Sequence, residues 1–462
     1  MVLWSCERSS QVMDESTVNG KPKCQRLHKG KDAGIDKINR LPEAILEHIL
    51  SFLPTVDAVK TSVLCKKWQY LWTSIPNVEF EEDSSSKREL FMNSVERVLL
   101  LRGCSHIRRF YIACNVFDDA YRVNLWVSAA VQQNVEECSL CLSGIKGPFA
   151  LPHCLFISTS LTNLELYVAG ALKLPSKIDL PNLKYLILMK IKFLDERSTE
   201  QLLSCPALQE LFVEDCNWSH LRAVTIFTPM LKSLTIRDKD RHRVGCQVMI
   251  CANNLESIYC KSAFVNDYCL RESCSLMEAV IDVAEFPLSR SREAAYRISK
   301  LLQGMRSVKS LELSSKTIEV LTSADEIYIH LLVFGNLRSL NLGRLDLKCG
   351  AVWGLLHHSP HLEMLEFREM IGLTSDDVEN SSLLNPTPGC FASHLKQIKI
   401  DDFITSFEMI RVVKVLLEHA VVLETLTICS TGNPAEPEME KVFREELLKL
   451  PCGSKGCQII LS

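Results

Sequence analysis

The chain has 462 residues, of which 47% are hydrophobic and 23% charged, and its formal net charge is -4. This length predicts more than one domain, and this composition is typical of a folded soluble protein. A charge so near neutrality argues against a surface built mainly for nucleic acid or acidic lipid. No apolar run reaches the roughly 18 residues of a membrane span, and the start of the chain lacks the pattern of a secretory signal.

Residues 1–34 are polar, with lysines and arginines dispersed among glycine, serine and histidine. This composition predicts a disordered tail. The basic residues leave two interpretations open, a nuclear import signal and a merely solvated tail, and the second is the commoner one.

The stretch LPEAILEHILSFLPTVDAVKTSVLCKKWQYLW, residues 41–72, is apolar at more than half of its positions. On a helical wheel its first part covers an apolar arc of about 160°, wider than the stripe of about 100° that one core requires. That arc consists of Ile45, Leu46, Ile49, Leu50, Phe52 and Leu53. Pro54 predicts the end of this first helix.

Two further short helices are predicted before residue 75. Asp57 is the expected N-cap of the second, with Ala58, Val59 and Val63 facing inward. The third carries Trp68, Leu71 and Trp72 at helical spacing. Three helices in about 40 residues sit near the lower size limit for independent folding. Their surplus apolar surface therefore predicts either a protein partner or packing against the domain that follows.

The segment DKINRLPEAILEHILSFLPTVDAVKTSVLCKKWQYLWTSIPNVEF resembles the plant F-box pattern, without a gap, over about 40 positions. The departures Lys37, Asn39, Cys65 and Lys67 place no charge on the apolar arc. The resemblance implies that three helices bind the Skp-type adaptor of a cullin-RING ubiquitin ligase. It implies that the adaptor-facing residues are Leu41, Pro42, Ile45, Leu46, Ile49, Leu53, Val59, Val63, Leu64, Trp68 and Leu71.

Downstream, the phrase L-x-x-L-x-L recurs with Ile, Val or Phe substitutions at intervals of about 21 to 33 residues, close to the period of leucine-rich repeats. Clear copies start at Leu161, Leu183, Leu208, Leu231, Leu255, Val308, Leu337, Leu362, Leu395 and Leu423, and weaker ones at Ile107, Val135 and Leu276. Alternating leucines predict short strands that stack into a parallel ladder. A doubly wound sheet is the alternative, but it does not explain the recurring phrase.

Helical apolar spacing in RSTEQLLSC, SREAAYRISKLLQGM and FEMIRVVKVLLEHA predicts return segments on the convex side of the ladder. The positions between the leucines would form the concave surface. They are mixed in charge and name no partner; examples are Glu165, Lys184, Gln209, Lys232, Arg338 and Glu363.

The segment CFASHLKQIKIDDFITSFEMIRVVKVLLEHAVVLETLTICS resembles the FBD segment that closes many plant F-box and repeat proteins. This resemblance implies a cap over the open end of the ladder. A last helix is expected in EPEMEKVFREELLKLP, with Met439, Val442, Phe443 and Leu447 inward. The expected organisation is a tail (1–34), an F-box (35–80), leucine-rich repeats (81–384) and an FBD-like segment (385–462). The fold class is α/β: a small all-α F-box followed by an irregular repeat solenoid and its cap.

No phosphate loop, dinucleotide motif, nucleophile elbow, H-E-x-x-H motif or RING-like Cys/His array occurs. Cys138 and Cys141 have metal-ligand spacing but no second pair, and on a strand they would face opposite sides. His357 and His358 lack a third ligand and suit a helix end. We therefore expect no catalytic residues, no metal and no cofactor. Twenty cysteines without an export signal indicate free thiols in a reducing compartment, hence the cytoplasm, the nucleus or both.

The F-box resemblance, together with the repeats in the same chain, implies a non-catalytic substrate-recognition subunit of an SCF-type (Skp-cullin-F-box) ubiquitin ligase. It would dock the adaptor through the F-box and a protein target through the repeats, with no nucleic acid and no membrane as partner. The alternative is a repeat-based binding scaffold without a ligase role, whose F-box packs internally. An enzyme with a pocket inside the solenoid has no residue constellation in its favour, although some plant receptors of this architecture bind a small ligand at the repeat face.

Overall fold

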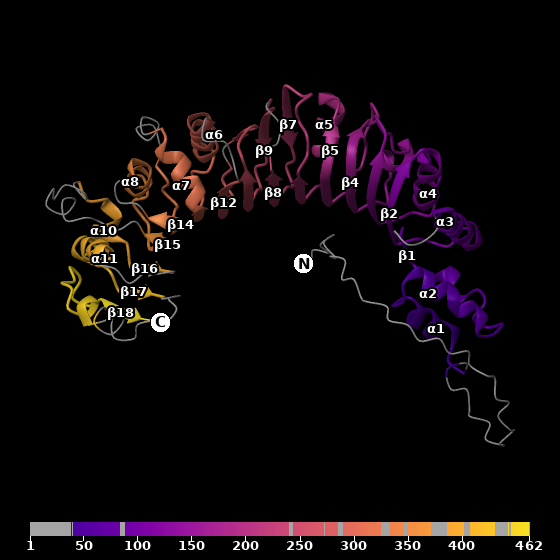
Figure 1. Cartoon of the computed structure of the whole chain (residues 1–462), viewed down its shortest axis with the longest axis horizontal. Helices are drawn as coiled ribbons and strands as arrows, with labels where there is room; N and C mark the ends of the chain where they lie inside the picture. Colours follow the sequence, from indigo (N-terminus) through magenta and orange to yellow (C-terminus); the bar gives the residue numbers. More distant parts are fainter. Residues whose placement is uncertain are drawn as a thin grey trace, which may run out of the picture.

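The computed structural model is an arch whose inner face is one long parallel sheet (Figure 1). It describes residues 38, 40–83, 88–239, 244–271, 273–284, 290–324, 333–345, 349–370, 386–401, 407–429, 442 and 445–461. The expected tail (1–34) lies outside these ranges. Within them, every helix is too short or too polar to cross a membrane.

The amino-terminal helices are α1 (Glu43–Leu50) and α2 (Thr55–Lys60), followed by the 3-10 turns η1 (Thr61–Val63) and η2 (Leu71–Ser74). Each α-helix begins directly after a proline, Pro42 or Pro54. The prediction that Asp57 is the N-cap of the second helix is wrong. Asp57 lies in the first turn of α2, where its carboxylate interacts favourably with the positive end of the helix dipole and forms an ion pair with Lys60 at 2.8 Å.

The expected third α-helix is also wrong, because residues 66–70 form turns that lead into η2. Trp68, Leu71 and Trp72 are nevertheless all buried, as their spacing predicted. The turns of this stretch are closed by hydrogen bonds between backbone groups three residues apart. In such turns, side chains three positions apart point in the same direction, so Trp68 and Leu71 can both face the core without an α-helix.

Fifteen strands pair in parallel in one sheet, in sequence order except that β7, β9 and β11 are left out. Every expected repeat start lies two residues before one of these strands and is buried. The repeat solenoid predicted from the sequence is therefore confirmed. The strands are β1 (Asn77–Glu81), β2 (Arg109–Phe117), β3 (Glu137–Ile145), β4 (Asn163–Leu172), β5 (Tyr185–Phe193), β6 (Glu210–Glu214), β8 (Ser233–Asp238), β10 (Ser257–Ser262), β12 (Glu278–Val283), β13 (Ser310–Leu313), β14 (Ser339–Leu345), β15 (Met364–Met370), β16 (Gln397–Ile400), β17 (Thr425–Ile428) and β18 (Gln458–Leu461). The end strands β1 and β18 carry no clear copy of the phrase.

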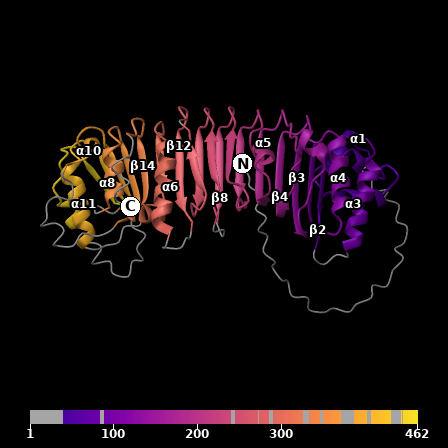
Figure 2. The same cartoon turned by 90° about the horizontal axis from the view of Figure 1, so that it is seen from above.

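The convex side carries helices toward both ends of the arch and a small second sheet in its middle (Figures 1 and 2). The three expected return helices are confirmed as α5, α6 and α11. The convex elements are α3 (Arg88–Arg102), α4 (Ala120–Gln132), η3 (His153–Ile157), α5 (Glu196–Leu203), α6 (Ser291–Gln303), α7 (Ser315–Thr322), α8 (Gly350–His357), α10 (Gly389–Ser393) and α11 (Phe407–His419).

The second sheet was not predicted. It has the order β11 (Asp267–Leu270), β9 (Gln247–Cys251), β7 (Ala223–Phe227), all parallel, and it replaces helices between α5 and α6. Repeat starts from Leu208 to Leu276 follow one another at only 21 to 24 residues, whereas 32 residues separate Leu276 from Val308 and include α6. A strand spans more distance per residue than a helix, so a return segment with few residues can cross the convex side as a strand.

The amino-terminal helices and the ladder share one hydrophobic core, which runs from Leu46 to Leu447. Thr55 Oγ1 accepts a hydrogen bond from the Glu79 backbone N–H of β1 at 2.8 Å. Arg102 of α3 donates to the Trp72 carbonyl at 3.3 Å. These bonds fix the orientation of α1 and α2 at one end of the arch.

At the other end the ladder continues in register through the expected FBD-like segment. Gln397 pairs with Met364 on one side and with Thr425 on the other, and Thr425 pairs with Gln458. Of the last expected helix, Leu447 is buried as predicted, whereas Val442 is exposed, which corrects the expectation for that residue. Met439 and Phe443 lie outside the described residues.

Candidate functional site

Helix α1 has two apolar faces. Leu46 and Leu50 are fully buried, whereas Ile45 is 46% exposed and Ile49 is 41% exposed. The arc of about 160° seen in the sequence is therefore divided between an inner and an outer side. The inner half holds the helix on its own core, and the outer half remains uncovered.

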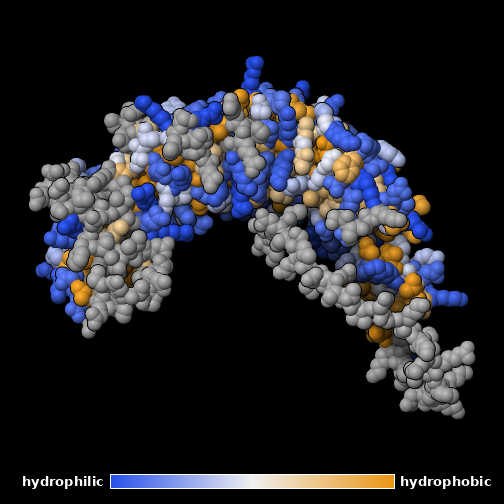
Figure 3. All heavy atoms as spheres, in the orientation of Figure 1, coloured by the Kyte–Doolittle hydropathy of each residue, from blue (hydrophilic) through white to orange (hydrophobic). Residues whose placement is uncertain are grey.

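Exposed apolar side chains continue beyond α1 along the same segment. Phe52 is 75% exposed and Val63 is 85% exposed, which is far above what a large apolar side chain in a core shows. Figure 3 shows hydrophobic residues gathered over α1 and α2 at the right-hand end of the arch. We call the set the F-box face; it consists of Ile45, Ile49, Phe52, Leu53, Val56, Val63 and Leu64.

The structure divides the eleven sequence-predicted contact residues into three groups. Pro42, Ile45, Ile49, Leu53, Val63 and Leu64 are exposed, and Leu41 and Val59 are half-buried. Leu46, Trp68 and Leu71 lie in the chain's own core. In the free chain these last three side chains hold the helices on their own core. Val63 was expected to point inward from the second helix and does not, because η1 follows α2 and turns the chain outward.

Sequence reasoning did not place Phe52 and Val56 among the contact residues, although both are exposed. Phe52 was on the apolar arc, and its ring meets that of His48 with centroids 4.8 Å apart. Val56 lies in the first turn of α2, where a lone valine gives no periodic signal. Lys67 Nζ donates to the Leu41 carbonyl at 2.6 Å and so joins the start of α1 to the turns that follow η1.

The uncovered apolar surface sets what this region can do. Burying one such side chain completely contributes about 1.5–3 kcal/mol, and monomeric proteins rarely expose large contiguous apolar patches. The seven side chains of the F-box face are all apolar and all at least 40% exposed. Its chemistry is therefore that of a protein–protein contact.

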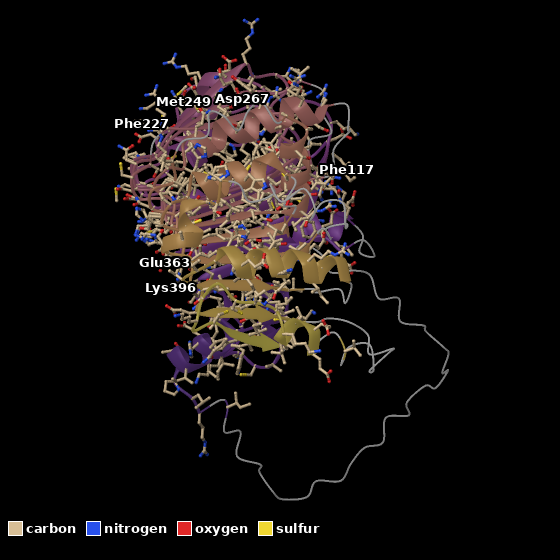
Figure 4. All side chains as sticks on the ribbon, turned by 90° about the vertical axis from the view of Figure 1, so that its left-hand side faces the viewer. Phe117, Phe227, Met249, Asp267, Glu363 and Lys396 are labelled. Carbon is tan, nitrogen blue, oxygen red and sulfur yellow. The ribbon has the colours of Figure 1, made fainter. Side chains whose placement is uncertain are left out.

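The residues expected on the concave surface occupy two different places. Glu165 lies within β4 and faces away from the core. Lys184, Gln209, Lys232, Arg338 and Glu363 instead precede their strands, at the edge of the ladder where the strands begin, as Figure 4 shows for Glu363 and its neighbour Lys396. Phe117, at the end of β2, lies at the opposite edge in that view.

Charges at the starting edge are largely paired between neighbouring repeats. Lys232 lies 3.4 Å from Glu256, and Arg338 lies 3.1 Å from Glu363. Exposed pairs of this kind contribute about 0–1 kcal/mol each. Positive and negative side chains along this edge therefore largely neutralise each other, and the edge does not favour a partner of one particular charge.

The other residues considered from the sequence have structural surroundings. Cys138 faces the core of β3, where burial raises its pKa to about 12, and Cys141 faces the opposite side, as expected. His357 ends α8, and His358 Nδ1 lies 2.6 Å from the Gly354 carbonyl oxygen. Across the described ranges, no group of three His, Cys, Asp or Glu side chains is arranged to hold a metal ion.

Comparison with protein families agrees with this architecture. A model of the F-box domain matches residues 38–80. A model described as "At1g61320/AtMIF1, LRR domain" matches residues 102–444, which is most of the chain.

Relatives from Arabidopsis thaliana share both parts. F-box/LRR-repeat protein At4g14096 is 30% identical over 453 residues, covering 92% of this chain and 94% of that protein. F-box protein At3g59000 is 32% identical over 384 residues, covering 74% and 75%. F-box/FBD/LRR-repeat protein At5g56420 is 28% identical over 440 residues, covering 92% and 98%. The chain therefore belongs to the plant F-box/LRR-repeat family.

Proposed function

We propose that this protein is the substrate-recognition subunit of an SCF-type E3 ubiquitin ligase. It docks a Skp-type adaptor through the F-box face and a protein target through the repeats. The observation that carries the proposal is the uncovered apolar half of α1 in a domain that is otherwise packed on its own ladder.

The expected contribution of the chain is position rather than chemistry. The F-box helices are joined to the ladder by the bond between Thr55 and Glu79 and by their common core. A target held on the arch would therefore keep a fixed direction relative to the adaptor. Holding a target lysine near a ubiquitin thioester raises its effective concentration, which supplies rate acceleration without a catalytic residue on this chain.

The proposed compartment is the cytoplasm, the nucleus or both. Every cysteine in the described ranges is a free thiol, and many of these thiols lie in the core. Free thiols are typical of a reducing compartment, which is also where a ubiquitin ligase would act.

The adaptor contact is tested by co-purification of the full chain with a Skp-type adaptor. Ile45→Glu places a charge on the F-box face at a side chain that is already 46% exposed. We expect recovery of the adaptor to fall at least about tenfold, because a buried unpaired carboxylate costs several kcal/mol at an interface. Thermal unfolding of the free chain should remain unchanged.

Met230→Glu is the matched control, because Met230 is also 46% exposed but lies on the arch far along the chain from the F-box. Its adaptor recovery should equal that of the wild type. Equal recovery by Ile45→Glu and Met230→Glu would contradict the proposed contact.

A second candidate is a binding scaffold without a ligase role. It is favoured by the core that the F-box helices share with the ladder, since that core stabilises them without any partner. The same experiment separates the two candidates, because a scaffold would recover no adaptor even as the wild type.

A further inference from the structure

Arg237 occupies an unusual place near the middle of the arch. It lies on β8, and its guanidinium carbon is 5.4 Å from the ring centre of Phe212 on β6 and 5.3 Å from that of Tyr259 on β10. These two strands are the immediate neighbours of β8. Contacts of a guanidinium with ring faces are favourable and leave its N–H edge free for other partners.

The charge of Arg237 is not matched by a neighbouring carboxylate. Two nearby cations each have one: Lys239 lies 3.7 Å from Asp215, and Lys261 lies 2.7 Å from Asp282. Among the described residues, the Arg237 side chain forms no ion pair or hydrogen bond, and its Nε is buried without a partner. Arg237 therefore lacks the carboxylate partner that Lys239 and Lys261 have, and its guanidinium can accept one from a bound molecule.

Glu214 is the closest candidate to neutralise Arg237, since the two residues are paired in register across β6 and β8. It does not come within ion-pair distance of the guanidinium in the described structure. Its charge instead acts with Asp215 to raise the pKa of Lys190, after the larger effect of the hydrogen bond between Lys190 and Tyr167. In the same register row, Glu214 and Arg237 are followed by Lys261 and Asp282, and of these two cations only Lys261 forms an ion pair in the described part of the chain.

Apolar side chains surround this cation on the same face of the sheet. They are half-buried, and they alternate with core positions, so they point away from the core. The central platform, as we name it, consists of Arg237 with Tyr167, Ile187, Met189, Phe212 and Tyr259. A platform of this kind offers three aromatic rings, aliphatic surface and the guanidinium of Arg237, which has no carboxylate partner among the described residues.

We propose that the central platform binds the protein target through one aspartate or glutamate side chain flanked by an apolar side chain. This proposal rests on the proposed function, in which the repeats hold the target. With Nε buried, the end of the guanidinium remains, and its two parallel N–H groups match the two oxygens of a carboxylate. A phosphate is less well matched, because its second negative charge would face the carboxylate of Glu214, which is paired in register with Arg237.

The proposal is tested with short random peptides displayed on phage and selected against the purified full chain. Parallel selections use Arg237→Gln, and Lys239→Gln as the matched control, because Lys239 is a neighbouring cation that already has a carboxylate partner. We expect the wild type and Lys239→Gln to enrich peptides with an acidic residue beside an apolar one. Arg237→Gln should bind the same synthetic peptides about tenfold or more weakly, as loss of a charge-assisted hydrogen bond requires.

Peptide variants then identify the chemistry. Replacing the peptide glutamate by glutamine should reproduce the loss seen with Arg237→Gln, and Arg237→Lys, which keeps the charge without the planar fork, should bind with intermediate affinity. Three results would overturn the proposal: no enrichment by the wild type, equal binding by wild type and Arg237→Gln, or tighter binding of a phosphoserine peptide than of its glutamate counterpart. Thermal unfolding of each variant verifies that the fold is kept.

Adaptor capture, measured on the same preparations, separates this proposal from the function on which it rests. If Arg237→Gln loses the peptides and still captures the adaptor, the platform is supported. If the wild type captures no adaptor while the peptides bind as expected, the ligase role fails and the platform stands.

Discussion

Cysteine side chains lie on both faces of the ladder, and the alternation of side chains along each strand determines which face a given cysteine occupies. Cys138 lies at a core-facing position of β3 and is almost fully buried, while Cys104 lies in an exposed loop after α3. Burial disfavours the thiolate, so the pKa of Cys138 rises to about 12, and that of Cys205 rises likewise to about 12. These thiols act as small apolar groups in the repeat core.

Buried thiols should make the fold sensitive to alkali. Below pH 9, the ordinary thiol value, Cys138 is protonated in both states and has no effect on the pH dependence of stability. Between pH 9 and about 12 the unfolded thiol ionises while the folded one stays protonated, so the free energy of unfolding falls by about 1.4 kcal/mol per pH unit for each such thiol. The measurement is denaturant unfolding between pH 8 and 11 for the wild type and Cys138→Ala.

Cys138→Ala should be less stable at pH 8 because of the cavity, but its stability should fall less steeply above pH 9. Cys104→Ala is the control, because the Cys104 side chain is exposed and lies outside the core, and the slope of this variant should equal that of the wild type. If Cys138→Ala kept the slope of the wild type, ionisation of this thiol would have no part in the alkaline loss.

At the scale of single elements, α5 shows how a convex helix is started by its cap. Asp195 precedes α5 and accepts hydrogen bonds from the Ser198 hydroxyl at 2.6 Å and from the Ser198 backbone N–H at 2.8 Å. These two bonds lower the pKa of Asp195. The short helix packs on β7 at the edge of the second sheet.

Removing this cap should destabilise α5 locally. We expect Asp195→Ala to lower the free energy of opening of α5 by about 1 kcal/mol, measured by hydrogen exchange of its amides. Because the folded pKa is lowered, the contribution of Asp195 is present above its unfolded pKa and is lost as the pH falls through the folded value. The wild type should therefore approach the variant in acid.

Asp118→Ala is the control for α5, because Asp118 pairs with Lys146 on an open surface and caps no helix. Its effect on the exchange of α5 should be negligible. Equal protection of α5 in Asp195→Ala and in the wild type at neutral pH would show that tertiary packing alone holds the helix.

For the whole molecule, the connection between the F-box helices and the ladder decides whether the arch can present a target in one direction. Thr55 and Glu79 form the bond between α2 and β1, and both sides of it are continuous with the core. In the proposed function, a rigid connection would transmit the position of a bound adaptor to the first repeat. A loose one would let the arch turn about the residues between them.

Thr55→Val keeps the shape of the side chain but removes the acceptor for the Glu79 N–H. An unsatisfied donor costs about 1–3 kcal/mol when it is buried, so the amides of β1 should exchange faster while those of β8 do not change. Thr61→Val is the control, because the Thr61 hydroxyl donates to Ala58 within the F-box helices and does not reach the ladder. Unchanged exchange of β1 in Thr55→Val would mean that packing, and not this bond, joins the two parts.

The sequence by itself determined the ladder and the presence of the F-box. Leu161, Leu183 and the other repeat starts are buried because L-x-x-L-x-L leaves an apolar face that only neighbouring strands can cover. The spacing of apolar residues in RSTEQLLSC likewise predicted helix α5, because the helical period of 3.6 residues shows in a short stretch of sequence. The surplus of apolar side chains on the first helix was also visible without a structure.

Only the tertiary structure decided which apolar side chains remain uncovered and which distant residues meet. Helical spacing placed Leu46 and Ile49 on one arc, and the position of α1 on its core assigned the first to the interior and the second to the surface. Phe212, Arg237 and Tyr259 stand 22 to 25 residues apart in sequence; the strand register places Phe212 and Tyr259 on either side of Thr235, and Arg237 is the next residue on that face of the same strand. The periodicity of apolar residues indicates which face of each segment is buried, whereas contacts between segments depend on how the segments pack in three dimensions.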